Sequence, residues 1–170
     1  AINDNNIIKK IGKRMGEQKK LLGINISFSP VLDLNTNPDN PIIGNRSFGQ
    51  DRYNVTSKAS ALMEGLHEEG ILTSGKHFPG HGDTYQDSHK ELPLVSFDKE
   101  RINEIEIYPY KKLIKNGLSS IMIAHLNVPE LTGSDKVPTS LSYEVVTKLL
   151  KEKIGFKGLI FSDAMNMKGV

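Results

Sequence analysis

Residues 76–89 carry most of the side chains in this sequence that could do acid–base or ligand chemistry. They contain three of the five histidines, two aspartates and Lys76. A short apolar run, residues 71–73, precedes them and predicts a buried strand, while one proline and two glycines disfavour a regular helix. We therefore expect these side chains on a loop at the carboxyl end of a strand, where barrels and open α/β sheets place their active sites.

Asp87 and His89 are spaced so that the carboxylate could accept the imidazole N–H. Such a bond orients the ring and stabilises its cationic form, which suits a general acid/base working near neutral pH. A local hydrogen bond on a surface loop would give the same spacing. The pattern alone does not separate these two interpretations.

Asp163 stands directly after the apolar run 158–162. A carboxylate at the end of a strand could serve as a nucleophile, a base or a metal ligand. Asp is also a favoured helix N-cap, and a helix could follow here. Both interpretations stay open on local sequence.

His77 and His81 lie close to further acids and a further histidine, which resembles a metal-binding cluster. Two histidines four residues apart share one face only on a helix, and Pro79 and Gly80 separate these two. A metal site built from the loop remains an alternative. Lys76 and Arg46 offer donors suited to sugar hydroxyls, carbonyls or phosphates, or else they are ordinary surface charges.

The composition is that of an ordinary soluble domain. A length of 170 residues suits one domain, with 37% hydrophobic and 25% charged residues. The net charge of +2 does not indicate a nucleic-acid partner, and the lack of cysteine excludes disulfides and thiolate metal sites. No apolar run is long enough to insert into a membrane, and the first six residues do not resemble a signal peptide. The compartment stays open between the cytoplasm and export to the cell envelope.

Helical and extended patterns alternate along the chain. Capping residues, apolar periodicity and terminal glycines predict a helix from Asn5 or Asn6 to Leu22, one from Asp51 or Asn54 to Glu69, and a helical turn capped by Asp98. They also predict helices over 109–116 and 142–154. The predicted strands are 24–34, 71–77, 120–124 and 159–162.

Strands that alternate with helices indicate βαβ units and a parallel sheet, so the fold class is α/β. The four predicted strands end in polar groups: Asp33, Lys76 with His77, His125, and Asp163. This pattern is typical of a partial (β/α)8 barrel of the TIM type, with about four parallel strands. A flavodoxin-like open sheet would have the same element order, but the glycine-rich loop expected after its first strand is not in the sequence.

Four segments together indicate a protein family more specifically than any one of them does. They are residues 29–33, 43–49, 76–89 and 161–165. In type, order and spacing they resemble the β-N-acetylglucosaminidases of glycoside hydrolase family 3. The resemblance covers nearly the whole chain. It is most specific in the loop from Lys76 to His89.

This resemblance implies a TIM-like barrel that hydrolyses terminal β-linked N-acetylglucosamine with retention of configuration, in peptidoglycan fragments or related glycans. Asp163 matches the family nucleophile, and His89, paired with Asp87, matches the acid/base. Arg46, Lys76 and His77 match residues that hold the sugar. The resemblance implies neither a metal nor an organic cofactor.

The sequence departs from the family pattern in one respect. In the family, the barrel begins with earlier strands, and one of them ends in an acidic motif that binds the sugar hydroxyls. This chain has no such motif. We therefore expect residues 1–170 to be a single central fragment of the catalytic barrel domain. Such a fragment would expose strand edges and an apolar inner face, so we expect the isolated chain to self-associate or to be markedly unstable, and to have little or no activity.

Three rival functions remain. A phosphorylase would form the same glycosyl-enzyme intermediate, and a histidine acid/base would not repel the attacking phosphate. A non-catalytic sugar-binding module would keep Arg46 and Lys76 without needing Asp163 and His89 together. A metal-dependent hydrolase is the third, and metal analysis of the purified protein would separate it from the others.

Overall fold

The structure of the chain is a computed structural model that describes residues 2–40, 42–84, 92–167 and 170. Its elements, in order, are α1 (Asn5–Leu21), β1 (Ile26–Ser27), η1 (Gly44–Arg46), α2 (Arg52–Glu68), β2 (Leu72–Phe78), α3 (Lys99–Arg101), η2 (Ile102–Glu106), α4 (Tyr108–Lys115), β3 (Ser120–Ile123), α5 (Pro129–Thr132), η3 (Thr139–Leu141), η4 (Glu144–Lys153) and β4 (Leu159–Ser162). No helix within the described ranges is long and apolar enough to cross a membrane.

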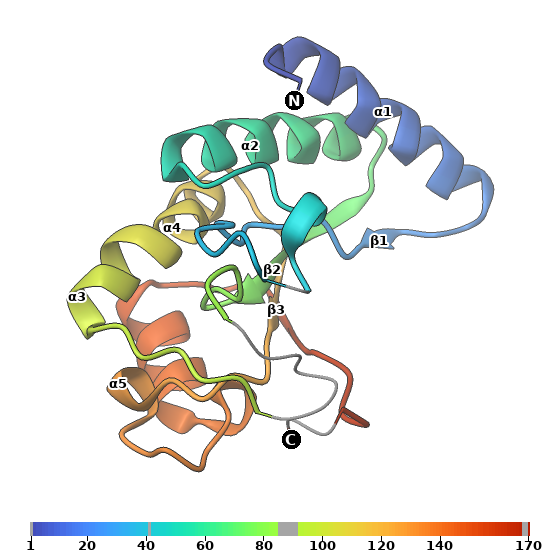
Figure 1. The fold of residues 1–170 in the computed structure, drawn as a ribbon. Coiled ribbons are helices and arrows are strands. Elements are labelled where there is room, and N and C mark those ends of the chain that lie inside the picture. Colours follow the sequence, from blue (N-terminus) through green and yellow to red (C-terminus); the bar gives the residue numbers. More distant parts are fainter. Residues whose placement is uncertain (1, 41, 85–91, 168–169) are drawn as a thin grey trace.

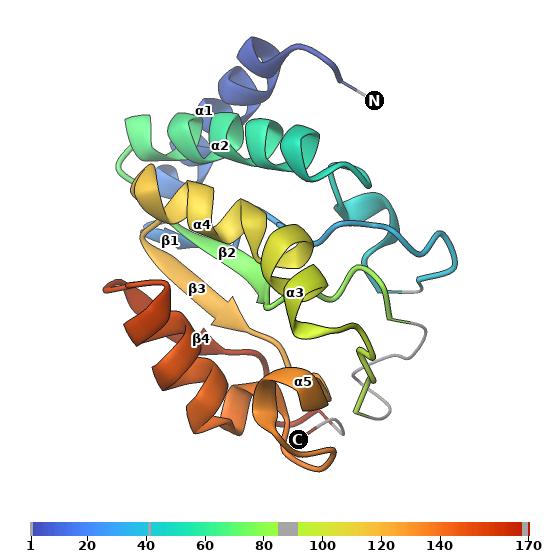
Figure 2. The same ribbon diagram turned by 90° about the vertical axis from the view of Figure 1, so that its left-hand side faces the viewer.

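The four strands form one parallel sheet whose spatial order, β1-β2-β3-β4, is also their order in the sequence. Each crossover therefore steps in the same direction, and right-handed crossovers then place every connecting helix on the same face. Figures 1 and 2 show α2, α4 and the helix before β4 on one side of the strands. A flavodoxin-like sheet would reverse direction after its first strand. The expected barrel-type α/β fold is confirmed.

The sheet is curved, and its first and last strands approach each other across the face opposite the helices. Phe28 follows β1 and Phe161 lies in β4, yet their rings meet edge to face with centroids 5.1 Å apart. β1 and β4 are not hydrogen-bonded neighbours. A flat sheet would hold these rings far apart, so the contact reports the inward curl of a barrel wall.

The main core lies between the sheet and its helices, and its largest fully buried side chains include Phe78, Tyr110 and Ile121. Phe78 of β2 and Tyr110 of α4 pack edge to face at 5.1 Å. Capping mostly follows the sequence prediction: the Asp51 and Asp98 carboxylates accept backbone N–H groups in the first turns of α2 and α3. At α1 the cap is Asp4, one residue before the predicted start.

The first strand is shorter than predicted. Residues 24–34 were expected to be extended throughout, but β1 covers only Ile26–Ser27, with an isolated bridge from Val31 to Lys76. Pro30 interrupts the ladder because it has no N–H to donate. The chain nevertheless follows β2, since the Pro30 carbonyl accepts from Lys76 and the Leu32 N–H donates to the Lys76 carbonyl. Asp33 therefore still arrives beside the end of β2.

Glycines allow α1 and α2 to cross in close contact (Figure 1). A Cβ added at Gly65 of α2 would lie 2.1 Å from the carbonyl oxygen of Lys9, and one added at Gly12 would lie 2.4 Å from that of Leu62. Real Cβ atoms do not approach backbone atoms so closely. The two helices are therefore held at a distance that only glycine permits.

We expect Gly65→Ala to destabilise the protein by about 1–3 kcal/mol, because α1 must move away from α2 to relieve the overlap. The sign is informative, since alanine in a helix would otherwise stabilise by about 1 kcal/mol. Urea unfolding monitored by circular dichroism measures the change. Gly16→Ala is the comparison: its Cβ would lie 2.7 Å from the Cβ of Glu69, a milder overlap than the 2.1 Å at Gly65, so the loss should be smaller. A stabilised Gly65→Ala variant would contradict the close crossing.

Candidate active site

A cavity of about 360 Å³ opens at the carboxyl ends of the strands. Its wall combines loops that are far apart in the sequence, from the region after β1 to the region after β4. The residues that line it are Phe28, Ile42, Arg46, Lys76, His77, His81, Met122, Ser162, Asp163, Ala164 and Met167. Four of the predicted site residues, Arg46, Lys76, His77 and Asp163, are therefore brought together in one place.

Asp33 lies beneath this wall and is only 1% exposed. Its Oδ2 accepts from the Nδ1 of His77 at 2.7 Å, and its Oδ1 accepts from the backbone N–H of His81 at 2.7 Å. The backbone N–H of His77 lies 3.1–3.2 Å from both oxygens. Burial acts to raise the pKa of the Asp33 carboxyl, but the interactions with His77 and His81 outweigh it and lower the pKa below its usual value. A buried carboxylate thus organises the first turn of the histidine loop.

Arg46 reaches the cavity from η1. Its Nη2 lies 3.3 Å from the Nε2 of His77, and its Nη1 donates to the Ile42 carbonyl at 3.1 Å. A guanidinium can only donate hydrogen bonds, so the Nε2 of His77 must accept in this contact. The contact places a permanent positive charge on one side of the cavity.

Lys76 lines the same cavity as Arg46 and Asp163. Burial lowers the pKa of its ammonium group and the Arg46 charge lowers it further, while Asp163 and Asp33 act in the opposite direction. Lys76 therefore combines a positive charge with partial loss of hydration. A cation in this state favours binding of polar oxygen atoms or anions.

Asp163 follows β4 directly. Its backbone N–H donates to the Ile123 carbonyl at 2.9 Å, and its Oδ1 accepts from the N–H of Ala164 at 2.8 Å. The described residues after it form a turn rather than a helix, so the N-cap alternative does not apply to them. The carboxylate lines the cavity as the only acidic side chain among the described lining residues.

Asp87 and His89 lie outside the described residues. Their predicted acid/base pairing therefore stays a prediction. The described part of their loop ends at Thr84, whose carbonyl accepts from the Nδ2 of Asn37 at 3.1 Å. The Nδ2 of Asn40 also donates to the His81 carbonyl at 2.8 Å. Two buried asparagines thus join the loop after β1 to the loop after β2.

Sequence reasoning missed these asparagines and did not show which way His125 faces. Asn37 and Asn40 belong to an Asn-rich stretch, residues 35–40, that indicates turns but not which loop they contact. His125 was expected among the polar groups at the strand ends, but it is fully buried and does not line the cavity. Its Nε2 donates to the carbonyl of Ala164 at 3.2 Å, so it supports the turn after Asp163 instead.

A metal centre finds little support in the geometry. The rings of His77 and His81 are 6.1 Å apart between centroids and nearly perpendicular. Both make other bonds, to Asp33 and to Thr84 respectively. Among the described residues, no group of three or more histidines and acids could hold a metal ion.

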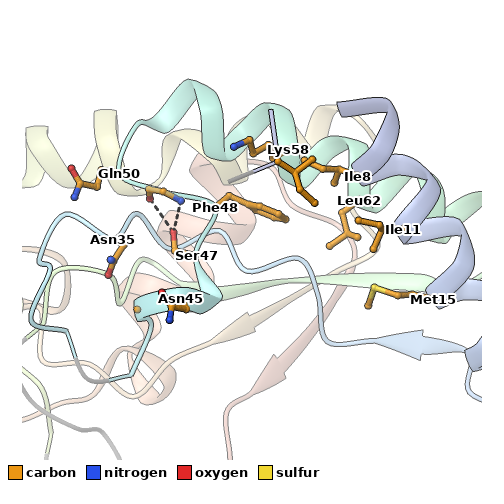
Figure 3. Close-up of a pocket in the computed structure, with 13 residues that line it drawn as sticks. Ile8, Ile11, Met15, Asn35, Asn45, Ser47, Phe48, Gln50, Lys58 and Leu62 are labelled. Carbon is orange, nitrogen blue, oxygen red and sulfur yellow. Dashed lines mark hydrogen bonds between the residues drawn. The ribbon is translucent and has the colours of Figure 1, made fainter. Parts of the chain in front are cut away.

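A second, larger cavity of about 640 Å³ lies between α1, α2 and the loop around η1 (Figure 3). Its walls are mainly apolar, from Ile8, Ile11 and Leu62, and Lys58 is the one charged side chain among the described lining residues. Among its described lining residues there is no carboxylate and no histidine. The larger cavity is therefore not the candidate active site.

Glu106, at the end of η2, packs against the histidine loop from the helix side. It is buried, and a Cβ added at Gly80 would lie 2.9 Å from its own Cβ. Neither carboxyl oxygen has a hydrogen-bond partner among the described residues, although Arg101, which binds Asp83 at 2.8 Å, comes within 3.7 Å. Burial raises the pKa of Glu106 to about 7.

This shift predicts a pH-dependent stability. Between the ordinary pKa of 4.5 and about 7 the folded protein binds more protons than the unfolded chain, so stability falls as the pH rises through that window. Glu106→Gln should remove the slope and stabilise the protein at pH 8 by about 1–3 kcal/mol. Thermal unfolding from pH 5 to pH 8 measures this, with the exposed Glu104→Gln as control. An unchanged slope in Glu106→Gln would show that another group titrates.

Comparisons with known proteins agree with the α/β fold described above. The family model described as the glycosyl hydrolase family 3 N-terminal domain matches residues 1–170. β-Hexosaminidase A of Pseudoalteromonas piscicida is 37% identical over 95% of this chain. The structure of a family 3 β-N-acetylglucosaminidase from Paenibacillus sp. str. FPU-7 superposes on 98% of the chain with a TM-score of 0.95 at 35% identity. A β-glucoside phosphorylase, BglX, superposes equally well, with a TM-score of 0.95 at 30% identity over 98% of the chain.

The chain spans 29% of the hexosaminidase, 32% of the glucosaminidase chain and 31% of the phosphorylase chain. The similarity to each nevertheless covers at least 95% of this chain. Over residues 1–170, the chain belongs to glycosyl hydrolase family 3, in the N-terminal domain of that family.

Proposed function

We propose that this chain forms part of a retaining glycoside hydrolase that releases terminal β-linked N-acetylglucosamine. The observation that carries the proposal is the single cavity in which the Asp163 carboxylate shares a wall with Arg46, Lys76 and His77. The names of the relatives, a β-hexosaminidase and a β-N-acetylglucosaminidase, support the same substrate class. Residues 1–170 would then be one part of the catalytic barrel.

In this scheme Asp163 attacks the anomeric carbon as the glycosidic bond breaks, which forms a covalent glycosyl-enzyme and releases the aglycone. His89, oriented by Asp87, donates a proton to the departing oxygen and later takes one from the attacking water. Two displacements at the same carbon restore the original configuration. Asp33 cannot be the second catalytic carboxylate, because buried N–H donors occupy both of its oxygens.

Arg46, Lys76 and His77 would bind the hydroxyl and carbonyl oxygens of the sugar. A volume of about 360 Å³ lies within the range for ligand pockets and accommodates a single sugar residue. Peptidoglycan fragments that end in N-acetylglucosamine fit this description. Self-association and low activity of the isolated chain remain predictions, and light scattering of the purified fragment tests the former.

A phosphorylase is the second candidate. Two cations, Arg46 and Lys76, line the cavity, and a β-glucoside phosphorylase is among the similar structures. Phosphate would then attack the glycosyl-enzyme in place of water. A positively charged wall and a histidine acid/base would both tolerate that anion.

One assay tests the proposal and separates the two candidates. The full-length protein is incubated with a chromogenic β-N-acetylglucosaminide, with and without phosphate, and the sugar product is followed by NMR. A hydrolase releases the free sugar, first as the β-anomer, at a rate that phosphate does not change. A phosphorylase forms the sugar 1-phosphate. Absence of turnover would refute the proposed activity. The α-anomer as first product would refute the retaining mechanism.

A further inference from the structure

Asp33 accepts hydrogen bonds from the backbone and also from the ring of His77, and the ring contact affects the cavity wall. We propose that Asp33 is a positioning residue: it fixes His77 in its neutral Nδ1–H tautomer and, through the Nε2 of His77, holds the Arg46 guanidinium at the cavity wall. The inference rests on the proposed function only in taking this cavity to be the sugar site. No substrate would touch Asp33 itself, which is 1% exposed.

The two ring nitrogens of His77 face partners of opposite kind. Nδ1 lies 2.7 Å from a carboxylate oxygen of Asp33, which can only accept. Nε2 lies 3.3 Å from the Nη2 of Arg46, which can only donate. The single arrangement that satisfies both contacts is a neutral ring with its proton on Nδ1. Asp33 therefore fixes the proton on Nδ1, and this leaves Nε2 free to accept the hydrogen bond from Arg46.

Loss of this arrangement would act on Arg46. In the other tautomer the Nε2–H of His77 would point at an Arg46 N–H, and two donors would face each other. Arg46 has a second anchor, the Ile42 carbonyl at 3.1 Å, but that bond holds only Nη1. A guanidinium has five N–H donors, so with both anchors in place the remaining ones stay available to a ligand in a fixed plane.

A purely structural role for Asp33 is the competing explanation, because the carboxylate also accepts backbone N–H groups from His77 and His81. Asp33→Asn separates the two roles. With its oxygen at the position of Oδ1, the asparagine still accepts from His81 and from the His77 backbone. Its NH₂ group then replaces Oδ2 and donates toward Nδ1, which should move the ring proton to Nε2. The two backbone contacts at Oδ1 survive and only the His77 backbone contact to Oδ2 is lost, while the tautomer reverses.

The first measurement is a long-range ¹H–¹⁵N spectrum of the full-length protein labelled in its histidines. In the wild type, Nδ1 of His77 should carry the proton, and in Asp33→Asn the proton should appear on Nε2. The side-chain resonance of Arg46 should shift in that variant. A wild-type ring protonated at Nε2 overturns the inference without any variant, so poor folding of Asp33→Asn would not protect it.

The second measurement is kinetic. Loss of a charge-assisted anchor on a group that holds the sugar should raise KM for the N-acetylglucosaminide about 10- to 100-fold in Asp33→Asn, with kcat changed less than about threefold. In an Arg46→Met background the same substitution should raise KM no more than about twofold, because the residue it acts through is gone. Equal effects in both backgrounds would overturn the inference. If the wild type neither binds nor cleaves the sugar, the proposed function fails, while the spectra still decide the tautomer and the Arg46 contact.

Discussion

Asp163→Asn should reduce kcat of the full-length enzyme on an aryl N-acetylglucosaminide by at least about 10³-fold. An amide cannot form the glycosyl-enzyme, so the reaction loses its covalent route. The local structure should persist, because the asparagine oxygen can still accept from the N–H of Ala164 as Oδ1 does. Binding of the sugar should therefore remain within about threefold of wild type.

Steady-state kinetics and equilibrium titration of the product sugar measure the two quantities separately. Mass spectrometry of the wild type during turnover should find the sugar attached to a peptide containing Asp163. The exposed Asp135→Asn serves as a control for loss of a carboxylate elsewhere. A variant at position 163 that retains more than about a tenth of the wild-type rate would remove Asp163 from the mechanism.

His89→Ala should affect substrates according to their leaving groups. For a disaccharide, whose departing oxygen needs a proton, kcat/KM should fall about 10²- to 10⁴-fold. For a nitrophenyl glycoside, whose leaving group departs as a stable anion, the loss should be less than about tenfold. Asp87→Ala should change both values in the same direction but less, because it acts on the orientation and charge of the ring.

The comparison of two substrates within one variant separates chemistry from folding. His67→Gln is the control, since that ring is bonded to Thr73 near the start of β2, away from the cavity. It should change neither substrate by more than about twofold. Equal losses on the disaccharide and the nitrophenyl glycoside in His89→Ala would assign His89 to sugar binding or stability instead.

Much of this site could be predicted because its parts follow strands. The limits of β2, β3 and β4 agree with the sequence within a residue or so, since β3 and β4 are short runs that are mainly apolar and β2 follows the apolar residue Ile71 directly after Gly70. In a parallel sheet the carboxyl ends of such runs meet at one edge. The sequence alone therefore predicts that Lys76, His77 and Asp163 lie close together.

The sequence says less about which polar residues face the cavity and which support it. Asp33, His125 and Asp163 all follow strands and look equivalent in sequence, yet only Asp163 lines the cavity. The difference arises from partners 39 to 48 residues away, such as Ala164 for His125 and His81 for Asp33. Local patterns do not contain such partners. The short extent of β1 was missed for a related reason, because the ladder with β2 continues past Pro30 only through irregular bonds.

The register of the sheet also bears on how quickly the chain can fold. Ile26 pairs with Leu72, Ser74 with Ser120, and Ser120 with Leu159, so no residue of the sheet pairs with another closer than 39 positions along the chain. Every strand pairing must therefore close a long loop before it gains a hydrogen bond. The contact between α1 and α2 also spans a long stretch, from Gly12 to Gly65. The individual helices should therefore form well before any pair of strands does. During that interval the apolar strands stay open to other chains, and refolding yield should fall as protein concentration rises.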